Sequence, residues 1–82
     1  MIRFTERAWD DYASWAADRK TLRRVNRLIE ESVRDPSFGT GKPERLRGDL
    51  SGCWSRRIDQ EYRLIYTVRD GELVILQARY HY

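Results

Sequence analysis

The fold is decided by YRLIYTVRDGELVILQARY, the stretch from Tyr62 to Tyr80. Large apolar residues alternate with other residues along its first half, as they do in a strand with one buried face. Asp70-Gly71 indicates a two-residue hairpin turn, because these residue types accept the positive φ that such a turn requires. The stretch therefore predicts two antiparallel strands. The residues expected on their buried face are Tyr62, Leu64, Tyr66, Val68, Val74, Leu76, Ala78 and Tyr80.

Shorter strands are expected upstream of this hairpin. Glu44–Leu46 and Trp54–Ile58 are candidates, joined through the turn residues Ser51-Gly52. Ile2–Phe4 adds a short first strand at the start of the chain. The loop FGTGKP at residues 38–43 is basic and contains glycine. It is not a phosphate-binding P-loop, because the GxxxxGK[ST] spacing is absent.

Two helices are predicted between the first strand and this loop. Thr5 can cap the first helix, with Glu6 in its first turn. The second helix is expected from about Thr21 to Asp35-Pro36, since the residue before proline disfavours the helical conformation. Apolar residues at helical spacing are Ala8, Trp9, Tyr12, Trp15 and Ala16, then Leu22, Val25, Leu28, Ile29 and Val33. The predicted fold class is α+β, with a short N-terminal strand and an αα-hairpin packed on one face of an antiparallel β-sheet.

The composition is that of a small folded protein. Eighty-two residues allow one domain, residues 1–82, and the apolar fraction of 40% and charged fraction of 35% are ordinary. Cys53 is the single cysteine, which excludes an internal disulfide and a cysteine-based zinc site. No segment has the apolar length of a signal peptide or a membrane helix, so we expect a cytoplasmic protein.

The basic residues are clustered, although the net charge is only +3. One cluster lies within residues 42–63, and a second follows a helical period from Arg19 to Arg34. Such clustering favours a polyanionic partner, through contacts with phosphate groups. The Arg19–Arg34 cluster fits an ordinary solvated helix face equally well.

The sheet face away from the helices is where chemistry is expected. By strand alternation, Arg63 points away from core-facing Leu64, and His81 away from core-facing Tyr80. The same reasoning predicts Glu44, Arg79 and one arginine of the 56–57 pair on this open face. A carboxylate, an imidazole and guanidinium groups could cleave RNA without metal, because the 2′-hydroxyl needs a base, the 5′-oxygen needs an acid and the phosphorane needs positive charge.

Each of these residues also has a plainer interpretation. Arg63 could pair with Glu61 or Asp59, and His81 could simply end an aromatic strand. A metal site is disfavoured, since one histidine without a grouped pair of acidic residues supplies too few ligands.

Five motifs run along the chain: WDDY at residues 9–12, GKPERL at 41–46, LSGCWSRRI at 50–58, EYRLIY at 61–66 and ARYHY at 78–82. At these spacings they resemble the YoeB/Txe toxins of the RelE/ParE superfamily, and the resemblance spans essentially the whole chain. It implies a RelE-like, microbial-ribonuclease-like fold and a ribosome-dependent mRNA endonuclease that inhibits translation. No cofactor is implied.

The resemblance also implies roles for individual residues. Glu44 of the KPE motif would be the general base, Arg63 would stabilise the phosphorane, and His81 would be the general acid. Tyr82 would help to position the substrate. Many members have lysine where this chain has Arg47, so positive charge is retained but proton donation is not. The residues assigned to substrate binding are Arg47, Arg56, Arg57 and Arg79.

The implied partners are a YefM/Axe-like antitoxin, the ribosomal A site with its mRNA, and a second copy of the toxin. No membrane is implied. The alternative is a non-catalytic toxin like those of the ParE branch, which act by binding a protein target such as DNA gyrase. Glu44, Arg63 and His81 together favour the enzyme, because a gyrase poison needs no acid, base and charge clamp.

Overall fold

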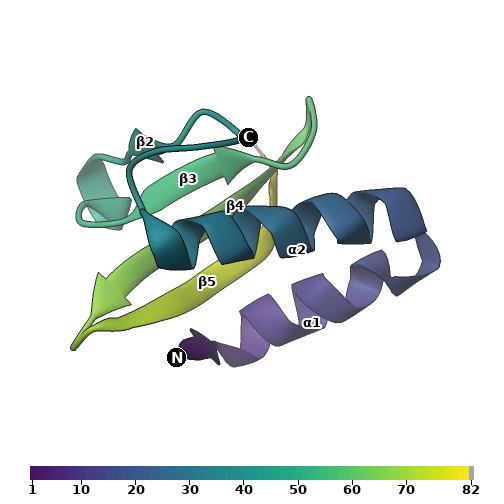
Figure 1. Ribbon diagram of the computed structural model, residues 1–82, viewed down its shortest axis with the longest axis horizontal. Helices are drawn as coiled ribbons and strands as arrows, with labels where there is room; N and C mark the ends of the chain where they lie inside the picture. Colours follow the sequence, from purple (N-terminus) through teal and green to yellow (C-terminus); the bar gives the residue numbers. More distant parts are fainter. Residues whose placement is uncertain (82) are drawn as a thin grey trace.

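The computed structural model describes residues 1–81 and confirms the predicted α+β class (Figure 1). Helices α1 and α2 lie together on one face of a five-stranded sheet whose strand order is β1-β5-β4-β3-β2. Two short 3-10 helices, η1 and η2, complete the described elements. In chain order these are β1 Ile2–Phe4, α1 Glu6–Ser14, η1 Trp15–Ala17, α2 Arg19–Arg34, β2 Glu44–Arg45, η2 Gly48–Leu50, β3 Trp54–Arg57, β4 Tyr62–Arg69 and β5 Glu72–His81.

The hairpin of β4 and β5 forms as predicted. Asp70 and Gly71 connect the two strands with φ angles of 51° and 77°, which is the positive pair that a type I′ turn requires. The sheet departs from the prediction at its edge, because β1 pairs with β5 in parallel. All the other strands come between β1 and β5 in the chain. The pairing of β1 with β5 is therefore set by the path of the chain through the helices and not by a local turn.

Local capping sets the helix ends. The Thr5 hydroxyl accepts a hydrogen bond from the Ala8 amide (3.0 Å), so α1 begins where the sequence predicted. Asp18 accepts from the Thr21 amide (3.0 Å), and α2 therefore begins at Arg19, two residues before the predicted start. The helix ends at Arg34, directly before the predicted stop at Asp35-Pro36.

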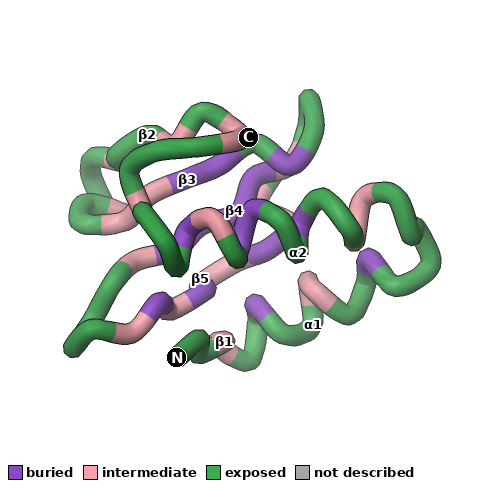
Figure 2. The backbone as a smooth tube through the Cα atoms, viewed as in Figure 1, coloured by how far each residue is buried: buried purple, intermediate pink, exposed green. Residues whose placement is uncertain are grey.

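The core lies between the helices and the sheet (Figure 2). Its centre is formed by side chains that are fully buried, such as Val25 and Leu28 of α2 and Tyr66 of β4. Four residues predicted for the core are instead exposed: Ala16, Trp9 (55%), Val33 (49%) and Val68 (46%). Val68 lies near the tip of the β4–β5 hairpin, which extends beyond the end of α2 (Figure 1) and leaves this position uncovered.

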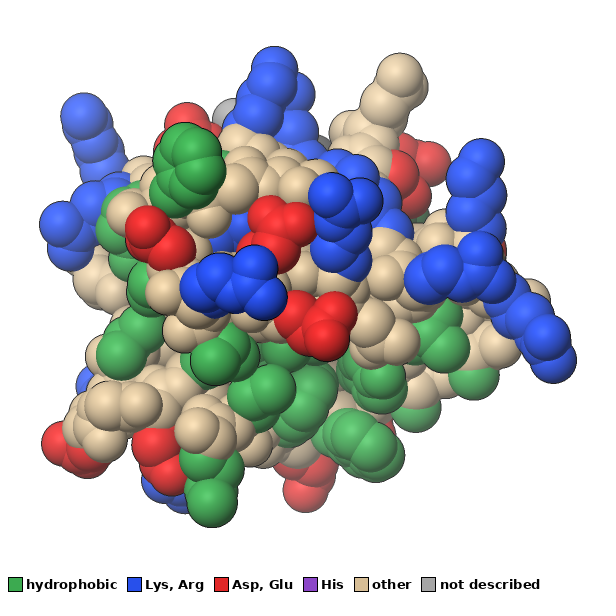
Figure 3. Space-filling view, in the orientation of Figure 1, with side chains coloured by type: hydrophobic (Ala, Val, Ile, Leu, Met, Phe, Trp, Pro, Cys, Tyr) green, Lys and Arg blue, Asp and Glu red, His purple; other side chains and the backbone are tan. Residues whose placement is uncertain are grey.

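The helix side of the molecule has a mixed surface (Figure 3). Basic and acidic side chains alternate over α2, while apolar side chains gather below it in this view. No helix within residues 1–81 is long and apolar enough to cross a membrane.

Candidate active site

Strand pairing places three of the predicted site residues on the open face. Residues directly opposite each other in neighbouring strands share a face, and the helices cover the face that carries Leu64 and Tyr66. Arg57 pairs with Arg63, and both therefore lie on the opposite face. Glu44 lies on that same face in the next cross-strand row, which contains Glu44, Ser55, Ile65 and Gln77.

The two arginines border a pocket of about 450 Å³ at one end of the sheet. Arg24 of α2 lines it as well, so three guanidinium groups border the pocket with Asp59 as the one acidic group. Asp59 accepts hydrogen bonds from the amides of Glu61 (2.8 Å) and Tyr62 (2.7 Å), which fixes the turn between β3 and β4. Guanidinium groups suit phosphate oxygens, because they donate several hydrogen bonds in a planar array.

Arg24 was missed as a candidate site residue. It belongs to the helical basic cluster, whose spacing gives no sign that one member reaches the sheet. Its Nε donates to the Ile58 carbonyl (2.6 Å) and its Nη2 to the Arg57 carbonyl (2.9 Å). These bonds tie α2 to the end of β3, so Arg24 supports the backbone that carries Arg57.

His81 and Arg79 are not on the open face, which corrects the prediction. Arg79 lies 4.0 Å over the Trp15 ring and donates to the Ser14 hydroxyl (2.7 Å), on the helix side. His81 pairs with Tyr62 at the end of β5, where their ring centroids are 5.6 Å apart. Its exposed imidazole Nε2 lies 3.7 Å from a Glu61 carboxylate oxygen.

The error came from the phase of β5. Leu73 and Ile75 face the core, whereas Tyr80 pairs with Arg63 on the open face. Two register shifts in the pairing with β4 each insert one extra residue into β5. Ala78 is buried in the core because of these insertions, and simple alternation from Ala78 then assigned the wrong face to its neighbours.

A buried arginine holds the loop that leads to Glu44. The Arg56 side chain is fully buried, and its guanidinium Nη1 lies 3.6 Å from a Glu31 carboxylate oxygen. It also donates four hydrogen bonds, to the carbonyls of Asp35 (2.6 Å), Phe38 (2.9 Å) and Thr40 (3.1 Å) and to the hydroxyl of Tyr66 (3.0 Å). Arg56 is therefore enclosed by the protein and does not belong to a surface that could touch a substrate, which corrects its assignment to substrate binding.

The same loop is fixed at Gly41. Its carbonyl accepts a hydrogen bond from the Arg57 amide (2.7 Å). A Cβ at this position would lie 3.1 Å from the Arg57 backbone nitrogen and oxygen, and the φ of 88° disfavours any side chain. The close contact between the loop and β3 sets where β2, and with it Glu44, joins the sheet.

Glu31 should make stability sensitive to acid. Hydrogen bonds from the Thr40 amide and hydroxyl, and then from Arg27, lower the pKa of the Glu31 carboxyl from 4.5 to about 2. A lowered folded-state pKa adds stability above the unfolded-state pKa, and this contribution disappears as pH falls from about 4.5 toward 2. We expect the difference in melting temperature between the parent and Glu31→Gln to shrink over this interval. A difference that stays constant down to pH 2 would contradict the assignment.

Two predicted residues remain to be placed. Arg47 is exposed and follows Leu46, whose amide donates to the Cys53 carbonyl (3.0 Å) and extends the pairing of β2 with β3 by one residue. Tyr82 lies outside the described residues. Within residues 1–81, no three His, Cys, Asp or Glu side chains form a group that could hold a metal ion.

Comparison with known families gives a full-length match. The family described as the YoeB-like toxin of bacterial type II toxin-antitoxin systems matches residues 4–82. The chain belongs to this family. It is 60% identical over 82 residues to the toxin YoeB of Streptomyces coelicolor, in a match that covers 99% of this chain and 98% of that protein. The resemblance found in the sequence motifs is thereby confirmed.

Two solved structures from Staphylococcus aureus are also similar. One is a heterotetrameric YoeB-YefM toxin-antitoxin complex, with 39% identity, a TM-score of 0.90, and coverage of 100% of this chain and 97% of that chain. The other is a YoeB dimer, with 40% identity, a TM-score of 0.89, and coverage of 99% and 95%.

Proposed function

We propose that this YoeB-family toxin is a ribosome-dependent endonuclease that cleaves mRNA and so inhibits translation, using no metal ion or cofactor. The proposal is carried by the placement of Glu44, Arg57 and Arg63 on one open sheet face. A carboxylate and two guanidinium groups are a base and a charge clamp for a phosphodiester. His81 lies off this face at the end of β5, one residue after Tyr80, which pairs with Arg63, and its exposed imidazole would supply the remaining group, a proton donor.

The proposed reaction is an internal transfer within the RNA. Glu44 takes the proton of the 2′-hydroxyl, and the 2′-oxygen attacks the adjacent phosphorus. Arg57 and Arg63 stabilise the charge of the phosphorane that forms. His81 protonates the departing 5′-oxygen as the P–O bond breaks, leaving a 2′,3′-cyclic phosphate and a 5′-hydroxyl. Arg47 adds positive charge, and Tyr82 positions the substrate.

The function is tested by translating a defined message with and without the protein. The parent should create new 5′ ends within the translated region, while Glu44→Gln should reduce them by about 100-fold or more because the base is lost. Translation arrest without new 5′ ends would instead support the alternative, a toxin that acts by binding a protein target.

The 2′-hydroxyl should be essential at the cleaved position. A message with a single 2′-deoxynucleotide there should resist cleavage at that site and remain sensitive elsewhere, since the attacking group is missing. Analysis of the product ends should give a 5′-hydroxyl and a 2′,3′-cyclic or 3′-phosphate. A 5′-phosphate would mean attack by water, and the roles given to Glu44 and His81 would be wrong.

The partners are proposed by similarity. The Staphylococcus aureus toxin of this family is found in a complex with YefM and as a dimer. We propose that this chain likewise binds a YefM-like antitoxin, forms a homodimer, and docks with mRNA in the ribosomal A site. The three arginines of the pocket at the sheet end would face phosphate groups in that complex.

A further inference from the structure

The open face continues well beyond the candidate active site. From the row of Arg57 and Arg63, the sheet runs through the Glu44 row to a third row formed by Thr67, Val74 and Arg3. All these residues lie on the side away from the helices. At about 3.3 Å per residue, β4 extends roughly 20 Å from Arg63 to Arg69. The candidate active site therefore lies at one end of this face, and Ser55 and Ile65 in its middle row are buried.

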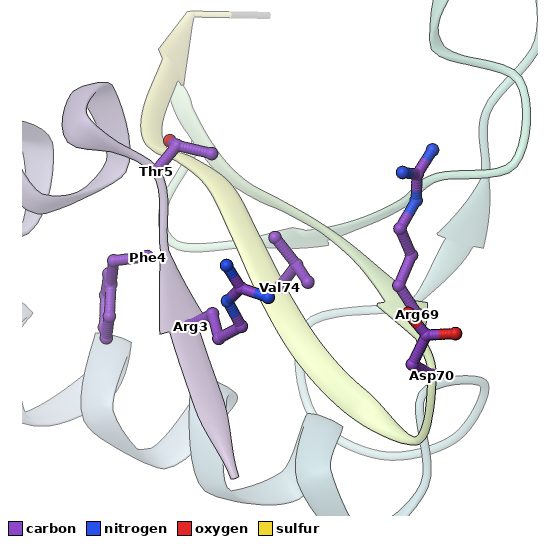
Figure 4. A pocket seen from close by; sticks show the side chains of 6 residues that line it. All are labelled: Arg3, Phe4, Thr5, Arg69, Asp70 and Val74. Atoms are coloured by element: carbon purple, nitrogen blue, oxygen red, sulfur yellow. The ribbon is translucent and has the colours of Figure 1, made fainter.

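Two hollows lie at the end of this surface that is farther from Arg63. One, of about 320 Å³, is bordered by Arg3 and Arg69, with Val74 between them (Figure 4). In the same view the Phe4 side chain points away from this hollow, toward the helices. The second hollow, of about 450 Å³, shares Arg69 and Val74 with the first and continues across Cys53 and Leu76. Because they share Arg69 and Val74, the two hollows lie side by side over β5 and β4, and together they are called the groove.

The charges of this groove lie at its ends. Arg69 is exposed. The Arg3 side chain is 70% exposed, and its guanidinium lies 3.6 Å from a carboxylate oxygen of Glu72. An exposed pair of this length is weak and can open for another anion. Arg69 and Cys53 both line the second hollow. Asp70 also lines the groove beside Arg69, whereas the lining residues Cys53, Thr67, Val74 and Leu76 are uncharged.

We propose that the open face binds single-stranded RNA along its length, with Arg3 and Arg69 holding a backbone phosphate several nucleotides away from the bond cleaved beside Arg63. Arginines lie at both ends of this face, and uncharged residues lie between them. A single RNA strand fits this pattern if its phosphates bind the arginines and its bases pack against the apolar side chains. This inference rests on the proposed function, since it takes RNA as the substrate. It adds a second contact site, which fixes how the strand lies across the toxin.

The test measures binding of three labelled RNAs to the full chain carrying Glu44→Gln, which prevents cleavage. One RNA is short and covers only the cleaved bond, while the other two extend it in the 5′ or the 3′ direction. Arg69→Glu should weaken binding of one extended RNA about tenfold, as loss of a charged hydrogen bond does. It should also reduce the salt dependence by about one phosphate contact. Binding of the short RNA should be unchanged.

Controls separate this site from general charge and from folding. Arg23→Glu makes the same charge change on the outer surface of α2 and should leave all three affinities nearly unchanged. Arg69→Gln avoids placing a second carboxylate opposite Glu72, with which Arg69 pairs across the hairpin, and should still weaken the extended RNA.

Two results would overturn the proposal. One is an equal loss of binding for all three RNAs, and the other is no loss of binding for any of them. The proposed function is judged separately, by cleavage with the unmodified chain. If the unmodified chain does not cleave RNA but binding still depends on RNA length, the proposed function is wrong and the proposed RNA contact at the groove stands.

Discussion

Deleting His81 and Tyr82 is expected to slow RNA cleavage by at least about 100-fold, the usual contribution of a general acid. The fold should survive, because the His81 side chain is exposed, and within residues 1–81 it meets the Tyr62 ring and, at 3.7 Å, the Glu61 carboxylate. The core residues Leu73, Ile75 and Ala78 all precede the deletion. Thermal unfolding of the shortened chain should stay cooperative, which circular dichroism would show.

Two further variants assign the effect to the imidazole. Deleting Tyr82 alone keeps the proposed acid and should cost less activity than the double deletion. His81→Gln keeps a hydrogen-bond donor but removes the transferable proton, and should be as slow as the double deletion. If His81→Gln cleaves messages at the parental rate, the imidazole is not the acid and the terminal motif serves the structure alone.

Much of the fold could be predicted because its signals are local. The Asp70-Gly71 turn, the Thr5 cap and the stop at Asp35-Pro36 each depend on a few neighbouring residues, and each forms as expected. The phase of β5 was different. Leu73-Val74-Ile75-Leu76 is apolar on both faces, so alternation does not say which face is buried, and the bulges that bring Ala78 into the core depend on pairing with β4.

The candidate site could be predicted only in part, for a related reason. Glu44 on β2 and Arg63 on β4 were placed on the correct face, because simple alternation holds along these two strands. Arg24 and Tyr80 were not recognised, because their positions near Arg63 depend on how α2 and β5 meet the sheet. Arg56 and Arg57 are two arginines in adjacent positions, so the residue type alone could not show which of them is buried and which is exposed.

Arg56→Ala is expected to lower the free energy of unfolding by about 3–5 kcal/mol, as the loss of one partner of a buried ion pair does. The reason is specific to this arginine. Its removal leaves the part-buried carbonyls of Asp35 and Phe38 without this donor, and it takes the buried guanidinium away from the Glu31 carboxylate, which keeps Arg27 as its other cation. Small domains have total stabilities of about 5–15 kcal/mol, so the variant should be largely unfolded on heating to moderate temperatures.

Arg57→Ala is the matched control, one residue further along β3. Arg57 is exposed, and its backbone hydrogen bonds with Gly41 and Arg24 do not involve its side chain. Stability should therefore change by no more than about 0.5 kcal/mol. Cleavage should nevertheless fall by about 100-fold, because one of the groups that stabilise the phosphorane is lost.

The two arginines should thus separate folding from catalysis. Chemical denaturation and message cleavage would be measured for both variants, with Arg56→Lys as a third that keeps the charge but loses most of the carbonyl contacts and should have intermediate stability. Equal losses of stability for Arg56→Ala and Arg57→Ala would show that the buried clamp is not specific to Arg56. Parental cleavage by a folded Arg57→Ala would remove Arg57 from the mechanism, because the charge that it places beside Arg63 would then have no part in stabilising the phosphorane.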